Sequence, residues 1–199
     1  MRSKGAIAAI VVVLVVLAAG CGACGTYNEL VEQDESVRRF WADVQSQYQR
    51  RSDLVPNLVR TVQGAADFEQ GTLTSVTDAR ARATSINVSA EDLGDPIAMR
   101  QFMEAQSQLG QSLGRLLAVA ENYPEIRATE AYRDLQAQLE GTENRIAVAR
   151  RDYNGAVQSY NTRLRSFPTN LIAGVFGFSA RTPFEASEGA DEVPTVEFN

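Results

Sequence analysis

The sequence predicts an all-α protein, with an N-terminal membrane helix followed by an elongated antiparallel four-helix bundle. An apolar run without a charge extends from Gly5 to about Gly25, and a run of about 20 such residues can cross a bilayer as a helix. Between Thr26 and Phe167, apolar residues recur every three or four positions, a spacing typical of helices in bundles and coiled coils. No window shows the sustained alternation that is typical of strands.

The first break in this apolar spacing lies in the stretch QRRSDLVPNLV (49–59). We expect one helix to end near Arg51 and the next to begin at Asp53, whose carboxylate can cap it. Pro56 would then lie in the first turn, where proline is tolerated because the N–H groups there have no partner within the helix. This interpretation makes the first two helices separate elements.

Three further breaks in the apolar spacing mark the ends of the remaining predicted helices. Turn-forming residues predict a loop at 87–96, and Asp95 before a proline is a typical helix start. The segment 121–130 is the next break, with Thr129 as the cap of the last helix, which ends at 166–168. Four long helices with short links favour an antiparallel bundle.

The N-terminal segment fits two kinds of membrane attachment. Arg2 and Lys4 precede the apolar run, so the positive-inside rule places the N-terminus in the cytoplasm and the body outside. The basic head, the apolar run and the small residues before Cys21 also resemble a lipoprotein signal. In that case Cys21 would become the lipidated first residue of the mature chain. That pattern usually has a large aliphatic residue where this chain has Ala18. Apolar length alone does not separate an uncleaved anchor from a lipid on Cys21.

The chain is predicted to divide into four parts. Residues 1–25 are the anchor or signal, and residues 26–168 form the helical body. Residues 169–184 are rich in apolar side chains and are expected to pack on the bundle or on the membrane. Residues 185–199 are acidic and without period, which predicts a disordered tail.

Composition excludes several classes of function. The net charge of −6 argues against nucleic acid as a partner, because phosphate binding needs a basic surface. The chain contains no histidine, and its two cysteines, Cys21 and Cys24, both lie in the N-terminal segment. The body therefore has no imidazole base, no thiolate and no usual zinc ligands, and we expect no metal and no cofactor.

Carboxylates are the remaining candidates for catalysis. Glu121, Glu140 and Glu143 lie near helix ends or on helix faces. A di-iron site in a bundle uses Glu-x-x-His pairs, which this chain cannot form, and glycoside chemistry needs a deep sugar cleft that a narrow bundle rarely offers. We therefore expect no enzyme activity; a hydrolase would have to depend on Glu121 or Glu143.

Four stretches carry a family resemblance in their residues and their order. They are YNELV (27–31), QYQRRSDLVPNLV (47–59), LLAVAENYPEIRATEAYRDLQAQLEGTENRIAVARRDYNGAVQSYN (116–161) and FP (167–168). Together they resemble the LemA family of bacterial membrane-associated proteins. The resemblance implies an N-terminal membrane segment, an extracytoplasmic helical bundle and no established enzyme activity. Some members are associated with membrane organisation, including magnetosome formation.

The residues that match the family's stretches are interpreted as structural. They are Arg50, Arg51, Asp53, Pro56, Asn57, Glu121, Asn122, Tyr123, Pro124, Glu143, Asn144, Arg145, Arg151, Tyr153, Asn154, Tyr160 and Asn161. The asparagines would fix helix register or end helices, because a buried amide is costly without hydrogen bonds. The alternative is a polar groove for a ligand near Asn122, Tyr123 and Arg145.

The arginines of the first and last helices allow two interpretations. Arg50, Arg51, Arg145, Arg150 and Arg151 would converge if those helices are neighbours. They would either pair with nearby carboxylates of the chain in a solvated network, or bind an anionic lipid headgroup or a carboxylate of a partner.

The sequence thus favours a membrane-anchored helical scaffold or adaptor of the bacterial cell envelope. Its expected partners are the membrane and other envelope proteins, and a long bundle with an apolar tail can also self-associate. A ligand-binding or sensing lipoprotein, with a groove between bundle helices, is the alternative.

Overall fold

The computed structural model describes residues 2–64 and 69–185, and the side chains among them from Gly22 onward except Ala23. Cys21 lies outside the residues with described side chains, as does nearly all of the predicted anchor, 1–25. The predicted acidic tail lies outside the described residues apart from Glu185.

The described residues form helices and no strand, so the all-α prediction is confirmed. The elements are α1 (Arg2–Val62), α2 (Gln70–Ser85), the 3-10 helix η1 (Glu91–Gly94), α3 (Pro96–Ala120), α4 (Pro124–Arg127), α5 (Glu130–Arg165) and α6 (Thr169–Phe176).

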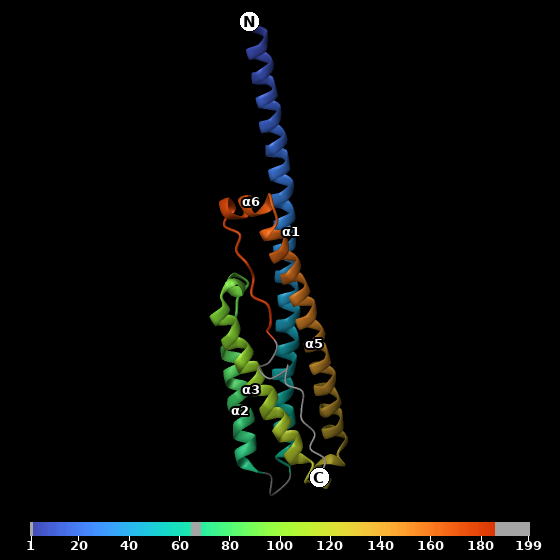
Figure 1. Ribbon diagram of the computed structural model, residues 1–199. Helices are drawn as coiled ribbons and strands as arrows, with labels where there is room; N and C mark the ends of the chain where they lie inside the picture. Colours follow the sequence, from blue (N-terminus) through green and yellow to red (C-terminus); the bar gives the residue numbers. More distant parts are fainter. Residues whose placement is uncertain (1, 65–68, 186–199) are drawn as a thin grey trace, which may run out of the picture.

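The four long helices lie in two pairs (Figure 1). α1 packs along α5 in the opposite direction, and α2 packs on α3 in the same way. α1 also contacts α2, which joins the pairs. The N-terminal part of α1 projects beyond every other helix, and α6 lies across α1 where this projection starts. In the part of the chain with described side chains, no helix has the length and apolar character needed to span a membrane.

The predicted break between Arg51 and Asp53 is wrong, because α1 continues through both residues to Val62. Pro56 lies inside this helix, where it cannot donate the usual hydrogen bond to the carbonyl of Ser52. Arg80 Nε of α2 donates to that carbonyl instead, at 2.8 Å. A side chain distant in the sequence thus supplies a donor to the carbonyl that the proline leaves without its helical partner.

The predicted helix starts at Asp95 and Thr129 and the predicted end at 166–168 are confirmed, whereas the break between α1 and α2, after Val62, was not predicted. Asp95 caps α3, its carboxylate accepting a hydrogen bond from the N–H of Ile97 at 2.8 Å. Thr129 caps α5, its hydroxyl accepting from the N–H of Tyr132 at 3.3 Å. α5 ends at Arg165, next to the predicted stop.

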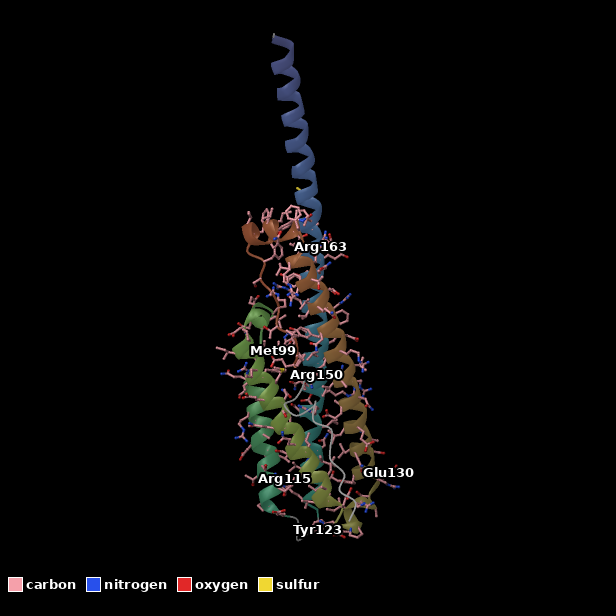
Figure 2. The ribbon with its side chains drawn as sticks, in the orientation of Figure 1. Met99, Arg115, Tyr123, Glu130, Arg150 and Arg163 are labelled. Atoms are coloured by element: carbon pink, nitrogen blue, oxygen red, sulfur yellow. The ribbon has the colours of Figure 1, made fainter. Side chains whose placement is uncertain are left out.

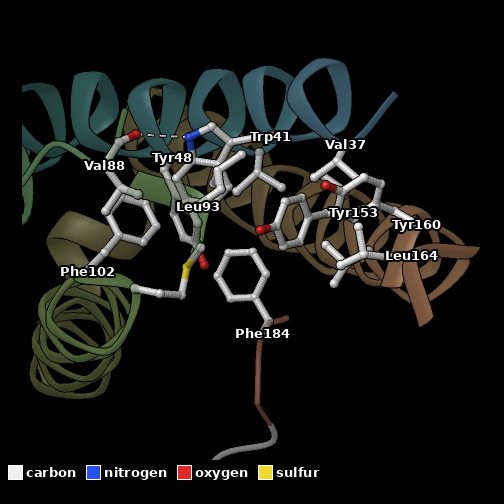
Figure 3. Packing of buried hydrophobic residues seen from close by; sticks show 14 of the residues in the cluster. Val37, Trp41, Tyr48, Val88, Leu93, Phe102, Tyr153, Tyr160, Leu164 and Phe184 are labelled. Carbon is white, nitrogen blue, oxygen red and sulfur yellow. Dashed lines mark hydrogen bonds between the residues drawn. The ribbon is translucent and has the colours of Figure 1, made fainter. Parts of the chain in front are cut away.

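Two hydrophobic clusters fill the interior, one above the other along the helices. The cluster nearer the projecting end of α1 is aromatic and includes Trp41, Phe102, Tyr153 and Phe184 (Figure 3). The indole N–H of Trp41 donates to the carbonyl of Val88 at 3.0 Å, so its polar atom is satisfied in the core. The second cluster is mainly aliphatic: Leu54, Val55, Leu58, Val62, Leu73, Val76, Ala79, Ala83, Leu109, Leu113, Leu116, Ala120, Ile126, Tyr132, Leu135 and Leu139.

Candidate functional site

A layer of buried polar residues separates the two hydrophobic clusters. Its members come from three helices: Arg51 and Ser52 from α1, Gln106 from α3 and Thr142 from α5. Along α1, α3 and α5, the cluster residues on one side of this layer belong to the first hydrophobic cluster, and those on the other side belong to the second. A buried polar group costs free energy unless it is hydrogen-bonded, so the partners of this layer decide what it can do.

Arg51 is the centre of the layer, with 3% of its surface exposed. Its Nη1 donates to Glu143 Oε1 at 3.1 Å. Its Nη2 donates to the main-chain carbonyl of Gln106 at 2.9 Å and to the side-chain Oε1 of the same residue at 2.6 Å. The guanidinium also lies over the ring of Tyr48, 5.0 Å from its centre.

Gln106 extends this network to the fourth long helix. Its Nε2 donates to the main-chain carbonyl of Ala83 in α2 at 3.2 Å. One arginine and one glutamine therefore join α1, α2, α3 and α5 at a single level. Arginine suits this position because its planar group offers several donors and keeps its charge when buried. Buried polar contacts of this kind can set the register of packed helices.

A cleft of about 750 Å³ opens beside the buried layer. Its lining is Tyr48, Arg51, Arg100, Met103, Glu104, Gln106, Ser107, Gln108, Gly110, Gln111, Arg150 and Glu185. Burial raises the pKa of Tyr48, and the charges of Arg150 and Arg51 oppose that rise. The lining holds both signs of charge and the amides of three glutamines, which suits a small polar ligand better than an apolar one.

A second polar arrangement holds the segment 178–185, here called the strap, against α5. Asn154 donates through Nδ2 to the carbonyl of Phe184 at 3.0 Å and accepts from the N–H of the same residue at 2.8 Å. Asn161 makes the same pair of bonds with Arg181, at 2.8 and 2.9 Å. Each amide thus satisfies both main-chain groups of one strap residue.

The tyrosine before each of these asparagines adds a further bond. Tyr153 donates its hydroxyl to the carbonyl of Thr182 at 2.9 Å, and Tyr160 donates to the carbonyl of Ser179 at 3.0 Å. Burial raises the pKa of both phenols above the ordinary value. The two Tyr-Asn pairs are seven residues apart, which puts them on the same face of α5.

The strap is also fixed from its other side. Arg181 donates through Nε to Asp34 Oδ1 of α1 at 2.8 Å, and both side chains are about 90% buried. The other oxygen of Asp34 accepts from Arg38 at 3.0 Å. The N–H of Thr182 donates to the carbonyl of Leu93 in η1 at 2.8 Å. At Gly94 an added Cβ would lie 3.3 Å from the carbonyl of Ala180, so glycine permits the strap to approach η1 closely.

The predicted arginines do not form one cluster. Arg51 is buried and shares its cleft with Arg150, whose guanidinium lies over the ring of Phe184 at 4.8 Å. Arg50 lines a shallow depression with Asp53, and Arg151 lines another with Asp152. Arg51 pairs with Glu143. Among the described side chains, this is the one ion pair between a predicted arginine and a predicted carboxylate.

The predicted groove residues also lie apart. Asn122 follows the end of α3, and Tyr123 and Pro124 begin α4 at the end of the molecule where Glu130 starts α5 (Figure 2). Arg145 is fifteen residues farther along α5, roughly 22 Å at the helical rise. With Asn144 it lines a shallow depression formed with Phe40 and Val148.

The remaining predicted residues are exposed, and three of them bond to a residue within about one turn. Asp53 accepts from Gln49 one turn earlier, so it does not cap a helix. Asn57 is exposed and accepts from Arg60. Glu121 follows the end of α3, and Glu140 accepts from Gln136 on the exposed side of α5. Within the described residues, no three Cys, Asp or Glu side chains are grouped to hold a metal ion.

Several residues of these networks were not predicted. Gln106 could have been found, because it occupies a position where the apolar spacing of its helix, from Phe102 to Leu109, requires a buried residue. Arg80 and Asp34 have no comparable signal, because their partners lie far away in the sequence.

Comparisons with known proteins agree on one family. The sequence model of the LemA family matches residues 40–198. The proteins named Magnetosome protein MamQ 1 and MamQ 2 of Paramagnetospirillum magneticum are each 29% identical to this chain over 181 residues, which cover 83% of this chain and 66% of each relative. Protein LemA of Metamycoplasma hominis is 26% identical over 164 residues, covering 82% of this chain and 71% of that protein. The chain thus spans slightly less than two thirds of the length of these MamQ relatives.

Proposed function

Because this chain belongs to the LemA family, we propose that it is a non-catalytic, membrane-anchored helical scaffold of the bacterial cell envelope. The relatives named as magnetosome proteins support an association with membranes. In this proposal the apolar run from Gly5 to Gly25 holds the chain in the membrane, and the four long helices act as one antiparallel bundle that presents binding surfaces to other envelope proteins.

The observation that carries the proposal is the continuity of α1. One unbroken helix links the apolar N-terminal segment to the body and ends at Val62. Its residues beyond Thr26 span about 54 Å at the helical rise. A rigid helix of this kind would hold the body at a fixed distance from the membrane, as a scaffold requires. The bond from Arg80 to Ser52 satisfies the carbonyl that Pro56 leaves without a helical donor.

The anchor is tested by fractionating cells that produce the full-length chain. We expect the chain to remain with membranes after an alkaline carbonate wash, and its body to be digested when protease is added outside the cytoplasmic membrane. Recovery of the chain in the cytosol would contradict the proposal. Mass spectrometry of the mature N-terminus then distinguishes an intact Met1 from a lipidated Cys21.

The scaffold role is tested by photocrosslinking in cells. A photoreactive residue at Val148, which is 48% exposed on α5, should capture a specific envelope protein. The matched control is Val157 on the same helix, which is 2% exposed and should capture none. If a series of exposed positions on all four long helices captures no envelope protein, the scaffold role fails.

A second candidate is ligand binding in the cleft beside Arg51. Arg100 and Arg150 line it together with the buried guanidinium, and polar side chains surround them. We expect a bound polar metabolite to raise the melting temperature of the full-length chain, and Arg100→Ala to remove that shift. The absence of any shift across small anionic metabolites would count against this candidate.

A further inference from the structure

Helix α6 exposes an apolar face for which the described residues provide no cover. Leu171, Val175 and Phe176 have 61%, 80% and 60% of their surface exposed, and Phe167 just before the helix has 80%. These four residues are here called the collar. The opposite face of α6 packs on the body through Thr169 and Ala173, which are buried. Helix α6 contains no charged residue, and its one exposed polar side chain is that of Asn170.

The collar lies where the apolar segment of α1 leaves the body. The ring of Tyr27 is 4.9 Å from the ring of Phe176 and 5.6 Å from that of Phe178. Tyr27 is two residues beyond the end of the apolar run, so α6 crosses α1 about half a turn past this end. Figure 2 shows the side chains of α6 pointing toward the end of the molecule from which α1 projects.

Charge changes sharply at the same level. No charged residue occurs in α6 or between Gly5 and Asn28. The first charge on α1 after that run is Glu29, which pairs with Arg163 of α5 on the body side of the collar. Apolar side chains with tyrosine at the border and charges beyond it are typical of a protein surface at the boundary of a bilayer.

We propose that the collar contacts the lipid surface, with α6 lying in the plane of the bilayer interface. This inference rests on the proposed membrane anchor, because that anchor would place the hydrocarbon boundary at the level of Tyr27. Insertion of Leu171, Val175 and Phe176 among the lipid chains removes apolar surface from water, as for other interfacial helices. A helix in the membrane plane, tied by its rings to α1, would also hold α1 upright and the body away from the lipid.

The test uses tryptophan fluorescence of the full-length chain in vesicles of phosphatidylcholine and phosphatidylglycerol, with or without bromine on the acyl chains. The native chain has one tryptophan, Trp41, which is buried in the body and supplies the baseline. We expect brominated lipid to lower the added emission of V175W roughly twofold, because position 175 would lie at the boundary of the acyl chains. L171W should respond in the same way.

The matched control is V148W, an exposed valine changed in the same way on α5 and about 25 Å from the α6 end of that helix. Its emission should be unchanged by bromine. If V175W and L171W are unquenched while washed vesicles retain the chain, the collar is wrong and the anchor stands. Blue-shifted emission without quenching would mean that protein, such as a second copy, covers the collar. Loss of the chain from the vesicles would overturn the anchor and the collar together.

Discussion

Arg80 of α2 donates a hydrogen bond of 2.8 Å to the main-chain carbonyl of Ser52, the carbonyl that Pro56 leaves without a helical partner. Ser52 is buried, so water cannot easily replace that donor. We therefore expect this contact to stabilise α1 at Pro56, and with it the rigidity on which the proposed scaffold depends.

Arg80→Ala should lower the free energy of unfolding by about 1–3 kcal/mol, because it leaves a buried carbonyl unsatisfied. Adding Pro56→Ala to this variant restores an N–H at position 56 and should recover most of the loss. Chemical denaturation measures both. Arg82→Ala removes an exposed arginine of the same helix and should change stability by less than about 0.5 kcal/mol. A double variant no more stable than Arg80→Ala would show that the hydrogen bond is not the cause.

Glu143→Ala should destabilise the protein by about 1–3 kcal/mol, since it leaves the buried Arg51 without its carboxylate. The value is below that for a fully buried pair because half of the Glu143 side chain is exposed. Glu140→Ala is the matched control, one turn away, and should have almost no effect. Equal losses in the two variants would mean that the ion pair with Arg51 contributes nothing specific.

The helix ends that could be predicted from sequence are those whose causes are local. Asp95 and Thr129 bond to main-chain N–H groups two and three residues ahead, so their roles are visible in a short window. A short window of sequence could not show that the helix continues through Asp53. Pro56 is stabilised by Arg80, which follows it by 24 residues in the sequence and approaches only when α2 packs on α1.

The candidate site was less predictable than the fold for the same reason. The resemblance selects Arg51 and Glu143, but their meeting with Gln106 depends on how three helices pack. The sequence of the strap has no apolar periodicity. Its position is set instead by side chains of α5 that bond to its main chain. The repeated Tyr-Asn pairs at 153–154 and 160–161 were the visible sign of that requirement.

Asp95→Ala should lower stability by about 1 kcal/mol, the usual loss of a helix cap. Asp53→Ala should change it by less than about 0.5 kcal/mol, because Asp53 is exposed in the middle of α1. Thermal and chemical denaturation of the two variants, side by side, check the corrected helix boundary. A larger loss at Asp53 would favour a helix start there after all.

Alkaline pH should destabilise the protein through its buried tyrosines. The pKa values of Tyr153 and Tyr160 are raised by burial, whereas in the unfolded chain they ionise near about pH 10. Between those values the unfolded state binds fewer protons, so the contribution of these two tyrosines to stability is constant below about pH 10 and falls above it. The chain has one lysine, Lys4, and arginine stays charged in this range. Tyrosine is therefore the main group that titrates above about pH 10. Tyr153→Phe should flatten the fall, measured by denaturation across this range; an unchanged slope would contradict it.

Trypsin cleavage after Arg181 measures how often the strap detaches from the body. Arg181 is held by Asn161 through the main chain and by Asp34 through its guanidinium, so trypsin can cut after it only when the strap detaches. Detachment requires the paired bonds of Asn154 and Asn161 to break. Weakening one pair should therefore raise the rate of this cleavage.

Asn154→Asp keeps the side-chain shape but replaces the donor to the carbonyl of Phe184 with an oxygen that repels it. We expect cleavage after Arg181 to accelerate roughly tenfold, because the two bonds to this residue contribute on the order of 1–3 kcal/mol. Mass spectrometry of timed digests measures the rate. Asn144→Asp makes the same change at an exposed site of α5 and should leave it unaltered. Equal rates in the native chain and the Asn154 variant would show that this amide does not hold the strap.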